Sequence, residues 1–328
     1  MTDSKPEKMI ELNAAETDAR IAHDALMRAL DRMLALRTEG RVHCPTRGVL
    51  PMAAGGRLLS MLASDGTHAL TKTVTVHPEN ARFSLPRVQA EAVVMRADNG
   101  QRIALLDGDM LTLRRTAALS VLAVSKLTPS TALRVTPGLR LVIVGAGVQA
   151  RAHAEAFIAQ GEVASIRIHS RNEASALGLA EALAPLAQSR GVEISWVDDL
   201  AAALASADIV VTATNSMEPV ISDEAADAIA DGTVVCAVGA FTAQMSELPP
   251  SLVRRAFVVV DALTACRAEA GDLIKAGVDW DAVQELGVDT RVPDDAESRP
   301  RPIVFKSVGC ALWDLAAANC VLEAVVQR

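Results

Sequence analysis

The chain has 328 residues, of which 50% are hydrophobic and only 2% aromatic, and its formal net charge is −8. This length accommodates two domains, and the apolar content is sufficient for large cores of aliphatic side chains. The negative charge argues against a nucleic-acid partner, and the charged N-terminus and short apolar runs argue against a signal peptide or a membrane span, so we expect a cytoplasmic protein.

The first third of the chain predicts a helix followed by a largely antiparallel sheet. The apolar spacing from Ala14 to Leu36 is helical, and Gly40 is a plausible C-terminal residue for that helix. Thr112 is expected to cap a second helix that runs from Leu113 to about Leu127. Four segments between the helices have the composition of strands, and the last two flank the hairpin sequence Asp98-Asn-Gly100: Leu58–Leu62, Ala69–His77, Val88–Met95 and Arg102–Leu106.

Three cations in this region are candidates for binding an anion. Strand alternation places Lys72 on the same face as Leu70 and Val74, where a lysine is costly unless it is paired; a snorkelling lysine is the alternative. Arg115 falls in the first turn of the expected helix, where a cation opposes the helix dipole, so a nearby anionic group explains it better than solvation does. Together with Arg47 from a Pro-containing loop, they predict a site suited to a carboxylate.

The segment from Leu139 to Asn172 reads as strand, glycine turn, helix and strand, which is the pattern of a dinucleotide-binding βαβ unit. The turn is Gly145-Ala-Gly147-Val148-Gln149-Ala150. Gly145 permits the tight turn, Gly147 lets the backbone approach a pyrophosphate, and Ala150 keeps helix and strand close. The helix N-terminus offers N–H groups to the phosphates. A tight turn that binds nothing is the alternative.

Strands and helices continue to alternate after this unit, which predicts a doubly wound parallel sheet. The expected elements are helix 173–189, strand 193–197, helix 200–206, strand 209–213, helix 222–230, strands 233–238 and 257–261, and helix 307–326. We therefore predict an α/β protein with a Rossmann-type NAD(P)-binding domain at 128–305. An α+β substrate-binding and dimerisation domain would comprise 1–127 and 306–328, completed by the C-terminal helix. Pro-rich crossings are expected at 128–138 and 289–302.

The end of the second strand of the βαβ unit indicates which nucleotide binds. An acidic residue there would contact the ribose 2′-hydroxyl of NAD, but the sequence has Ser170, Arg171 and Asn172. A hydroxyl and a guanidinium favour a 2′-phosphate, so we expect NADPH, with NADH possible. Thr214 and Gly239 follow later strands of the expected sheet. They should lie at the edge formed by the carboxyl ends of the strands, where the ribose and nicotinamide of a dinucleotide bind in such folds.

The cysteines and histidines do not predict a metal site. The five cysteines are scattered and show no CxxC spacing, which is typical of reduced core thiols. The six histidines show no HxxxH or HExxH spacing, so no metal is expected.

Motifs along nearly the whole chain resemble the ornithine cyclodeaminase/μ-crystallin family. They are Arg47, Met61, Lys72 in LTKTV, Asp107-Gly with Leu-Thr112-Leu-Arg-Arg115-Thr-Ala-Ala, GAGVQARAH from Gly145, Val-Thr-Ala-Thr214, Ala-Val-Gly239, Asp261 with Glu269-Ala-Gly-Asp272, and Phe305-Lys-Ser-Val-Gly309 with Asp314. The resemblance implies a homodimer whose first domain supplies the dimer sheet. It also implies that Arg47, Lys72 and Arg115 bind a substrate carboxylate.

Activities in this family include ornithine cyclodeaminases, alanine-type dehydrogenases and cyclic ketimine reductases. The cyclodeaminases have an acidic residue where this chain has Phe241, and without it cyclisation lacks its base. We therefore expect NADPH-dependent reduction of Δ1-pyrroline-2-carboxylate and Δ1-piperideine-2-carboxylate. An NAD-dependent ornithine cyclodeaminase, an amino-acid dehydrogenase and a non-catalytic NADPH-binding protein are the alternatives. Asp107 and Asp314 are candidate proton donors.

Overall fold

The computed structural model describes residues 8–128, 138–292 and 301–326. Contacts within the chain divide it into two compact units, Met1–Arg115 with Cys310–Arg328, and Thr116–Gly309. Most of the two expected crossings, at 128–138 and 289–302, lies outside the described residues. Whether the units serve as the substrate and nucleotide domains stays a prediction. No helix in the described ranges combines the length and hydropathy that a membrane span needs.

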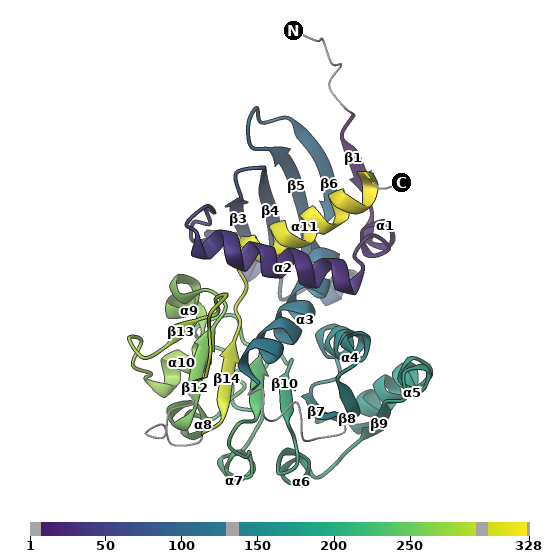
Figure 1. Cartoon of the computed structure of the whole chain (residues 1–328), viewed down its shortest axis with the longest axis vertical. Coiled ribbons are helices and arrows are strands. Elements are labelled where there is room, and N and C mark those ends of the chain that lie inside the picture. The colour runs from purple at the N-terminus through teal and green to yellow at the C-terminus, as the bar shows by residue number, and fades with distance from the viewer. Residues whose placement is uncertain (1–7, 129–137, 293–300, 327–328) are drawn as a thin grey trace. The chain divides into compact units, whose positions relative to one another are not determined.

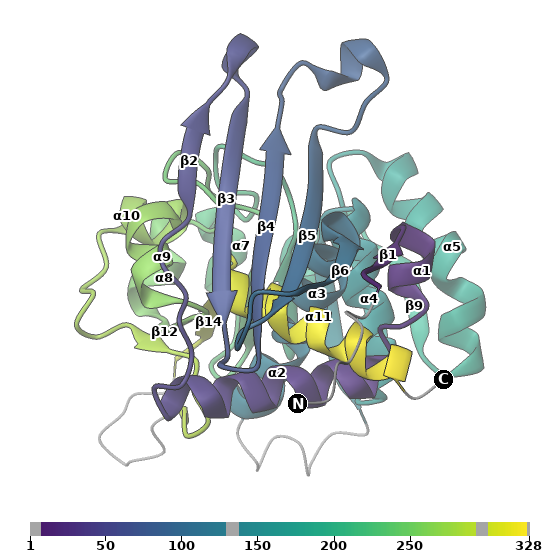
Figure 2. The same cartoon turned by 90° about the horizontal axis from the view of Figure 1, so that it is seen from above.

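The first unit contains a six-stranded sheet with the order β1-β6-β5-β4-β3-β2, whose long strands are seen in Figure 2. Strands β2 to β6 are antiparallel, and β1 pairs with β6 in parallel. The four predicted strands and the Asp98-Asn-Gly100 hairpin are confirmed, whereas β1 and β2 were too short to be expected. The bounds are β1 Ile10–Leu12, β2 Gly48–Pro51, β3 Arg57–Ser64, β4 His68–Val76, β5 Val88–Arg96 and β6 Arg102–Asp107, with short 3-10 turns at Ala53–Gly55 and Asn80–Phe83.

The prediction of one helix from Ala14 to Leu36 is wrong, because two helices occupy this region. Helix α1 (Ala14–Asp18) begins at a capping box in which Asn13 and Glu16 bond each other's backbone N–H groups. Helix α2 (His23–Thr38) starts after Ala22, whose extended backbone (φ −70°, ψ 136°) interrupts the helical path. Gly40 has a φ of +69° just beyond α2, as predicted for the residue that ends the helix.

Helix α3 (Gly108–Leu127) begins five residues before the predicted start, so Thr112 is not its cap. The cap is Asp107, whose Oδ1 accepts a hydrogen bond from the Met110 N–H at 2.7 Å. Thr112 lies inside the helix and donates its hydroxyl to the carbonyl of Gly108 at 2.8 Å. Arg115 therefore lies beyond the first turn, and the argument from the helix dipole was wrong.

The C-terminal helix α11 (Ala311–Val326) belongs to the first unit, lies beside α2 and crosses β3 and β4 (Figure 1). Asn319 fastens it to the sheet: its amide nitrogen donates to Asp65 at 2.7 Å and its oxygen pairs with His68 Nδ1 at 2.8 Å. The contacts between α11 and α2 include an ion pair between Arg32 and Glu323 and the stacking of Arg37 over Trp313. These contacts fix the position of α11 in the first unit.

The second unit contains an eight-stranded sheet in which every pairing is parallel. The order is β13-β12-β14-β11-β10-β7-β8-β9, so the strand order reverses between β7 and β10. In doubly wound folds, ligands bind at the carboxyl ends of the strands at such a reversal. The bounds are β7 Leu139–Val144, β8 Val163–His169, β9 Glu193–Trp196, β10 Ile209–Thr212, β11 Val234–Ala237, β12 Phe257–Val260, β13 Gln284–Glu285 and β14 Ile303–Lys306.

Helices cover both faces of this sheet, which confirms the predicted α/β class. On one face, a continuous apolar core joins strand residues such as Val142 and Val210 to helices α6 to α10. On the other face, α4 packs against β7, β8 and β10. The bounds are α4 Val148–Gln160, α5 Glu173–Ser189, α6 Leu200–Leu204, α7 Asp223–Asp227, α8 Pro250–Arg255, α9 Leu263–Glu269 and α10 Gly271–Ala276.

His153 is a fully buried histidine on α4. Its Nδ1 lies 2.7 Å from the carbonyl oxygen of Gln149, and its Nε2 lies 3.0 Å from the hydroxyl of Ser120. A carbonyl can only accept, so Nδ1 carries the proton of the neutral ring. Burial lowers the pKa of His153 to about 4, from an ordinary value of 6.5.

We therefore expect the free energy of unfolding to fall as the pH drops from 6.5 towards 4. Over this range the unfolded chain binds a proton at His153 and the folded chain does not, which costs about 3 kcal/mol of stability. Urea unfolding at a series of pH values checks this, with His153→Gln compared with the exposed control His43→Gln. If wild type and His153→Gln lose stability equally over this range, His153 is not the group responsible.

Candidate active site

Lys72, Arg115 and Asp314 form a buried ion cluster in the first unit. The Nζ of Lys72 lies 3.0 Å from Asp314 Oδ1, and the Nε of Arg115 lies 3.1 Å from the same oxygen. Lys72 also donates to the hydroxyl of Thr112. All three charged residues are 5% exposed or less. The strand alternation thus placed Lys72 on the apolar face correctly, and its partner is a carboxylate from α11.

The cluster carries two cations for one carboxylate. Burial disfavours the charged form of Asp314, but the charges of Lys72 and Arg115 outweigh it and hold the pKa of this carboxyl below its usual value. The pKa of Lys72 is also lowered, chiefly by burial and further by the charge of Arg115, against the attraction of Asp314. Asp109 adds a weaker attraction, but burial raises the pKa of that carboxyl. The arrangement favours the binding of a further anion.

Arg47, the third predicted cation, lies half-buried in the loop directly before β2. Gly48 of β2 pairs with Ser60 of β3, so the register brings Arg47 towards Met61, the residue that pairs with Lys72. Arg47 thus lies close to the sheet row of Lys72.

The glycine turn of the second unit has the backbone that phosphate binding requires. Gly145 has a φ of +127°, and a Cβ there would lie 2.6 Å from the carbonyl oxygen of Ala213. Gly147 is the N-cap of α4, has no side-chain cap and borders open space where a Cβ would stand. Val148 is exposed, Gln149 is half-buried and Ala150 is fully buried against the sheet. The free N–H groups at this helix end fit a dinucleotide pyrophosphate.

The residues that follow β8 lie at the surface of the second unit. Ser170 is half-buried and accepts a hydrogen bond from the backbone N–H of Asn172 at 3.3 Å. Arg171 is exposed. Asn172 is the N-cap of α5, and its side-chain oxygen accepts from the N–H of Ser175 at 3.1 Å. Of these three residues, Arg171 is therefore the one with a charged side chain that can bind a 2′-phosphate.

Thr214 and Gly239 are brought together by Glu247, a residue that the sequence did not suggest. One oxygen of Glu247 accepts from the N–H and the hydroxyl of Thr214, at 2.6 and 2.8 Å. The other accepts from the N–H groups of Gly239 and Ala240, at 2.7 and 3.1 Å. A Cβ at Gly239 would lie 2.1 Å from the carbonyl oxygen of Thr214, so only glycine fits. Glu247 thus joins the loops that follow β10 and β11.

Glu247 is itself held by a second buried carboxylate. Asp272 Oδ1 accepts from the backbone N–H groups of Glu247 and Leu248, at 2.6 and 2.9 Å, and from the hydroxyl of Ser246. Its Oδ2 lies 2.8 Å from the ammonium of Lys306, which is fully buried. Asp272 and Lys306 therefore fix the segment that presents Glu247.

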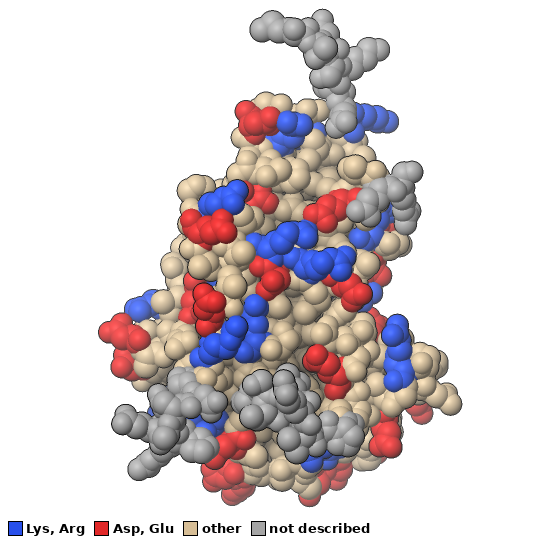
Figure 3. Space-filling model, in the orientation of Figure 1, with Lys and Arg blue, Asp and Glu red and all other residues tan. Residues whose placement is uncertain are grey.

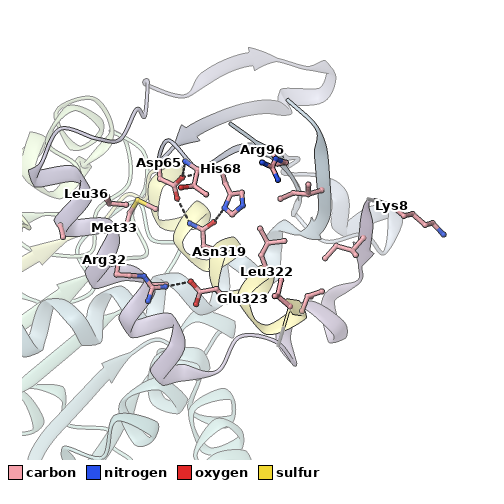
Figure 4. Close-up of a pocket in the computed structure, with 17 residues that line it drawn as sticks. Lys8, Arg32, Met33, Leu36, Asp65, His68, Arg96, Asn319, Leu322 and Glu323 are labelled. Carbon is pink, nitrogen blue, oxygen red and sulfur yellow. Dashed lines mark hydrogen bonds and ion pairs between the residues drawn. The ribbon is translucent and has the colours of Figure 1, made fainter. Parts of the chain in front are cut away.

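A separate cavity of about 990 Å³ lies in the first unit, lined by residues of β1, α2 and α11 (Figure 4). Its polar lining includes Asp65, His68 and Asn319, the group that fastens α11, and Lys72 and Arg115 do not line it. The ion cluster is thus distinct from this cavity. On the face that Figure 3 shows, positive and negative side chains are interspersed.

Sequence comparisons identify related proteins over almost the whole chain. Residues 7–328 match the model of the ornithine cyclodeaminase/mu-crystallin family. The Δ1-pyrroline-2-carboxylate reductase 1 of Burkholderia multivorans is 38% identical over 317 residues, 96% of each chain. The Δ1-pyrroline-2-carboxylate/Δ1-piperideine-2-carboxylate reductase of Azospirillum brasilense is 36% identical over 316 residues, again 96% of each chain.

A solved structure of a related enzyme has the same fold. It is the Δ1-pyrroline-2-carboxylate reductase of Thermococcus litoralis in complex with NADH and L-proline. The two chains are 25% identical with a TM-score of 0.85, and the match covers 97% of this chain and 98% of the other.

Removing the charge of Asp314 should strongly destabilise the protein. In Asp314→Asn two buried cations lose their shared carboxylate, and we expect the free energy of unfolding to fall by about 3–5 kcal/mol. Glu323→Gln is the matched control: it lies on the same helix, its pair with Arg32 is about half exposed, and its loss should cost about 1 kcal/mol or less. Urea unfolding of both variants measures the difference. If Asp314→Asn and Glu323→Gln both lose equally little free energy of unfolding, the cluster does not depend on Asp314.

Proposed function

The chain belongs to the ornithine cyclodeaminase/mu-crystallin family, and we propose that it reduces cyclic 2-imino acids with NADPH. The substrates would be Δ1-pyrroline-2-carboxylate and Δ1-piperideine-2-carboxylate, and the products L-proline and L-pipecolate. The relatives from Burkholderia and Azospirillum are named for these substrates. The observation that carries the proposal is the buried cluster in which Lys72 and Arg115 share the single carboxylate of Asp314.

A substrate carboxylate would complete the charge balance of this cluster. Lys72 supplies a compact charge and Arg115 a planar guanidinium that can bind a carboxylate through two parallel hydrogen bonds. Arg47, close to the row of Lys72, would be the third contact. Since burial strengthens each of these interactions, an anion that reaches the cluster gains more there than it would at the surface.

Reduction of the C=N bond needs a hydride at carbon and a proton at nitrogen, and Lys72 is the better proton donor. Asp314 is a poor acid because its two cations lower its pKa and keep it ionised. Asp107 uses one oxygen to cap α3. Lys72, in contrast, has its pKa lowered by burial, which makes loss of its proton easier. Asp314 Oδ2, buried and without a hydrogen-bond partner in the part of the chain described, would accept the N–H of the protonated imine.

The second unit would hold the nicotinamide cofactor, which supplies the hydride when bound. The N–H groups at Gly147 would bind the pyrophosphate, and the Thr214 and Gly239 loops, joined by Glu247, would border the nicotinamide end. The relative from Thermococcus litoralis binds NADH. Preference for NADPH in this chain rests on Ser170 and Arg171, since no acidic side chain precedes α5 to bind the ribose 2′-hydroxyl.

We also propose that the protein is a homodimer that pairs through the open face of the first unit's sheet. Helices α2 and α11 cover one face, whereas apolar side chains remain exposed on the rest of the sheet. They include Leu50 (59% exposed) and Leu62 (43%), which the register places on the face opposite to that of Met61 and Lys72. Exposed aliphatic side chains on a sheet face are typical of a surface that a partner covers.

The reductase proposal predicts that the purified protein oxidises NADPH when either cyclic imine is added and forms the corresponding L-amino acid. We expect NADPH to give a kcat/KM about tenfold or more above that of NADH, the effect of one charge-assisted contact to the 2′-phosphate. Absorbance of the reduced cofactor and chiral chromatography of the product measure both quantities.

Release of ammonia from ornithine without net formation of NADH would instead identify a cyclodeaminase. We expect none, because Phe241 stands where that reaction needs a carboxylate. Binding of NADPH without turnover of either imine would favour a non-catalytic binding protein. Equal use of NADH and NADPH would contradict only the interpretation of Arg171.

A further inference from the structure

The cavity of about 990 Å³ in the first unit takes no part in the proposed reductase site. Lys72, Arg115 and Asp314 do not line it, and its walls include residues of β1, β6, α2 and α11 (Figure 4). Its volume is in the range of sites that bind small molecules. Protein interiors are close-packed and leave few voids larger than a water molecule, so a space of this size within one unit is best explained by an occupant.

The two helices give the cavity an apolar wall. Ala29, Met33 and Leu36 of α2 are four and three residues apart, which places them on one face of the helix. Leu322 and Val325 of α11 are three residues apart and share a face in the same way. All five line the cavity. An apolar molecule would therefore be removed from water between the two helices, which favours its binding.

A β-bulge in β6 adds Ile103 to this wall. Val94 of β5 pairs with Ala104. The next residue, Met95, pairs with Arg102, so Ile103 is an extra residue between the two pairs. A bulge re-aims the side chain of its strand, and bulges are frequent beside functional sites. Here the re-aimed side chain of Ile103 lines the cavity.

His68 borders this apolar space with a defined hydrogen-bonding role. Asp65 accepts the backbone N–H groups of Thr67 and His68 and the amide of Asn319. Because the Asn319 nitrogen is the donor to Asp65, its side-chain oxygen must accept from His68 Nδ1, at 2.8 Å. In the neutral ring Nε2 can then only accept. It lies on the edge of the ring away from Asn319, and no residue that the structure describes bonds to it (Figure 4).

The charged side chains around the cavity do not favour a charged ligand. Arg32 is paired with Glu323 at 2.8 Å, and Arg96 is paired with Asp98 at 2.7 Å. Lys8, a further cation of the lining, is exposed to solvent. An ionised ligand would have to compete with these pairs, whereas an uncharged ligand needs only a donor for the histidine.

We propose that this cavity binds an uncharged molecule that has an apolar body and one hydroxyl group. The body would lie between α2 and α11, and the hydroxyl would donate its hydrogen bond to His68 Nε2. A buried acceptor without a donor is costly, so this contact would select the hydroxyl compound from analogues that lack the O–H group. The ligand and the imine would bind at separate sites. This last consequence rests on the proposed function, whereas the binding itself does not.

Two naphthalenes test the proposal on the wild-type protein. 2-Naphthol has the hydroxyl, and 2-methoxynaphthalene has the same rings and oxygen but no donor. Isothermal titration calorimetry at pH 7.5 measures both dissociation constants. We expect 2-naphthol to bind about tenfold more tightly, the effect of one hydrogen bond. Absence of binding, or equal affinity of the two compounds, overturns the proposal.

The variant His68→Leu removes the acceptor and keeps an apolar side chain. We expect the ratio of the two dissociation constants to fall to about twofold or less. His43→Leu is the control, because His43 is exposed in the same unit and does not line the cavity. Its ratio should equal that of wild type. A ratio that is unchanged in His68→Leu contradicts the proposed contact.

The variant Ala35→Trp locates the ligand, because Ala35 lines the cavity and an indole there would fill it. Both naphthalenes should bind about tenfold or more weakly, while Ala174→Trp, at an exposed position of α5, should change neither affinity. Undiminished binding of 2-naphthol to Ala35→Trp overturns the proposal. Competition between 2-naphthol and Δ1-pyrroline-2-carboxylate for wild type also overturns it, by placing the naphthol at the imine site. If wild type turns over no imine, the reductase proposal fails and calorimetry still decides this one.

Discussion

The first unit depends on one buried carboxylate, Asp314, which must balance Lys72 and Arg115 at once. Each cation alone would be costly in an apolar core, and each is stable there because α11 brings a carboxylate to both. Lys72 and Asp314 are 242 residues apart in the sequence, so the cluster forms only when the end of the chain returns to the sheet. The contacts of Asn319, Glu323 and Trp313 that hold α11 are therefore part of the construction of the substrate site.

The second unit also depends on buried carboxylates, which there hold backbone loops in place. Glu247 and Asp272 are buried carboxylates whose oxygens accept backbone N–H groups, which keeps the loops after β10 and β11 in one arrangement. Lys306 balances the charge of Asp272 from β14, the strand that continues towards α11. In both units the ionised groups take their partners from distant segments of the chain. A shape defined by such groups is preorganised for its ligand, which lowers the cost of binding.

The features that could be predicted from the sequence are those that the pattern of neighbouring residues determines. The glycine turn at Gly145 and the face of Lys72 follow from periodicity within a few residues, and both predictions agree with the structure. The break at Ala22 and the cap at Asp107 were missed, because no glycine or proline marks the first and Thr112 offered a plausible competing cap for the second. Glu247 carries no local signal, since its partners Thr214 and Gly239 lie 33 and 8 residues away in the sequence and no short motif links them to it. The pairing of Asp314 with Lys72 was hidden for the same reason.

The central claim is that the ion cluster recognises the carboxylate of a cyclic imine. The most direct measurement compares kcat/KM for Δ1-pyrroline-2-carboxylate with that for Δ1-pyrroline, which has the same ring and C=N bond but lacks the carboxylate. We predict a loss of at least about a hundredfold for Δ1-pyrroline, because charge-assisted contacts to Lys72 and Arg115 are absent. Comparable values for the two imines would contradict the account.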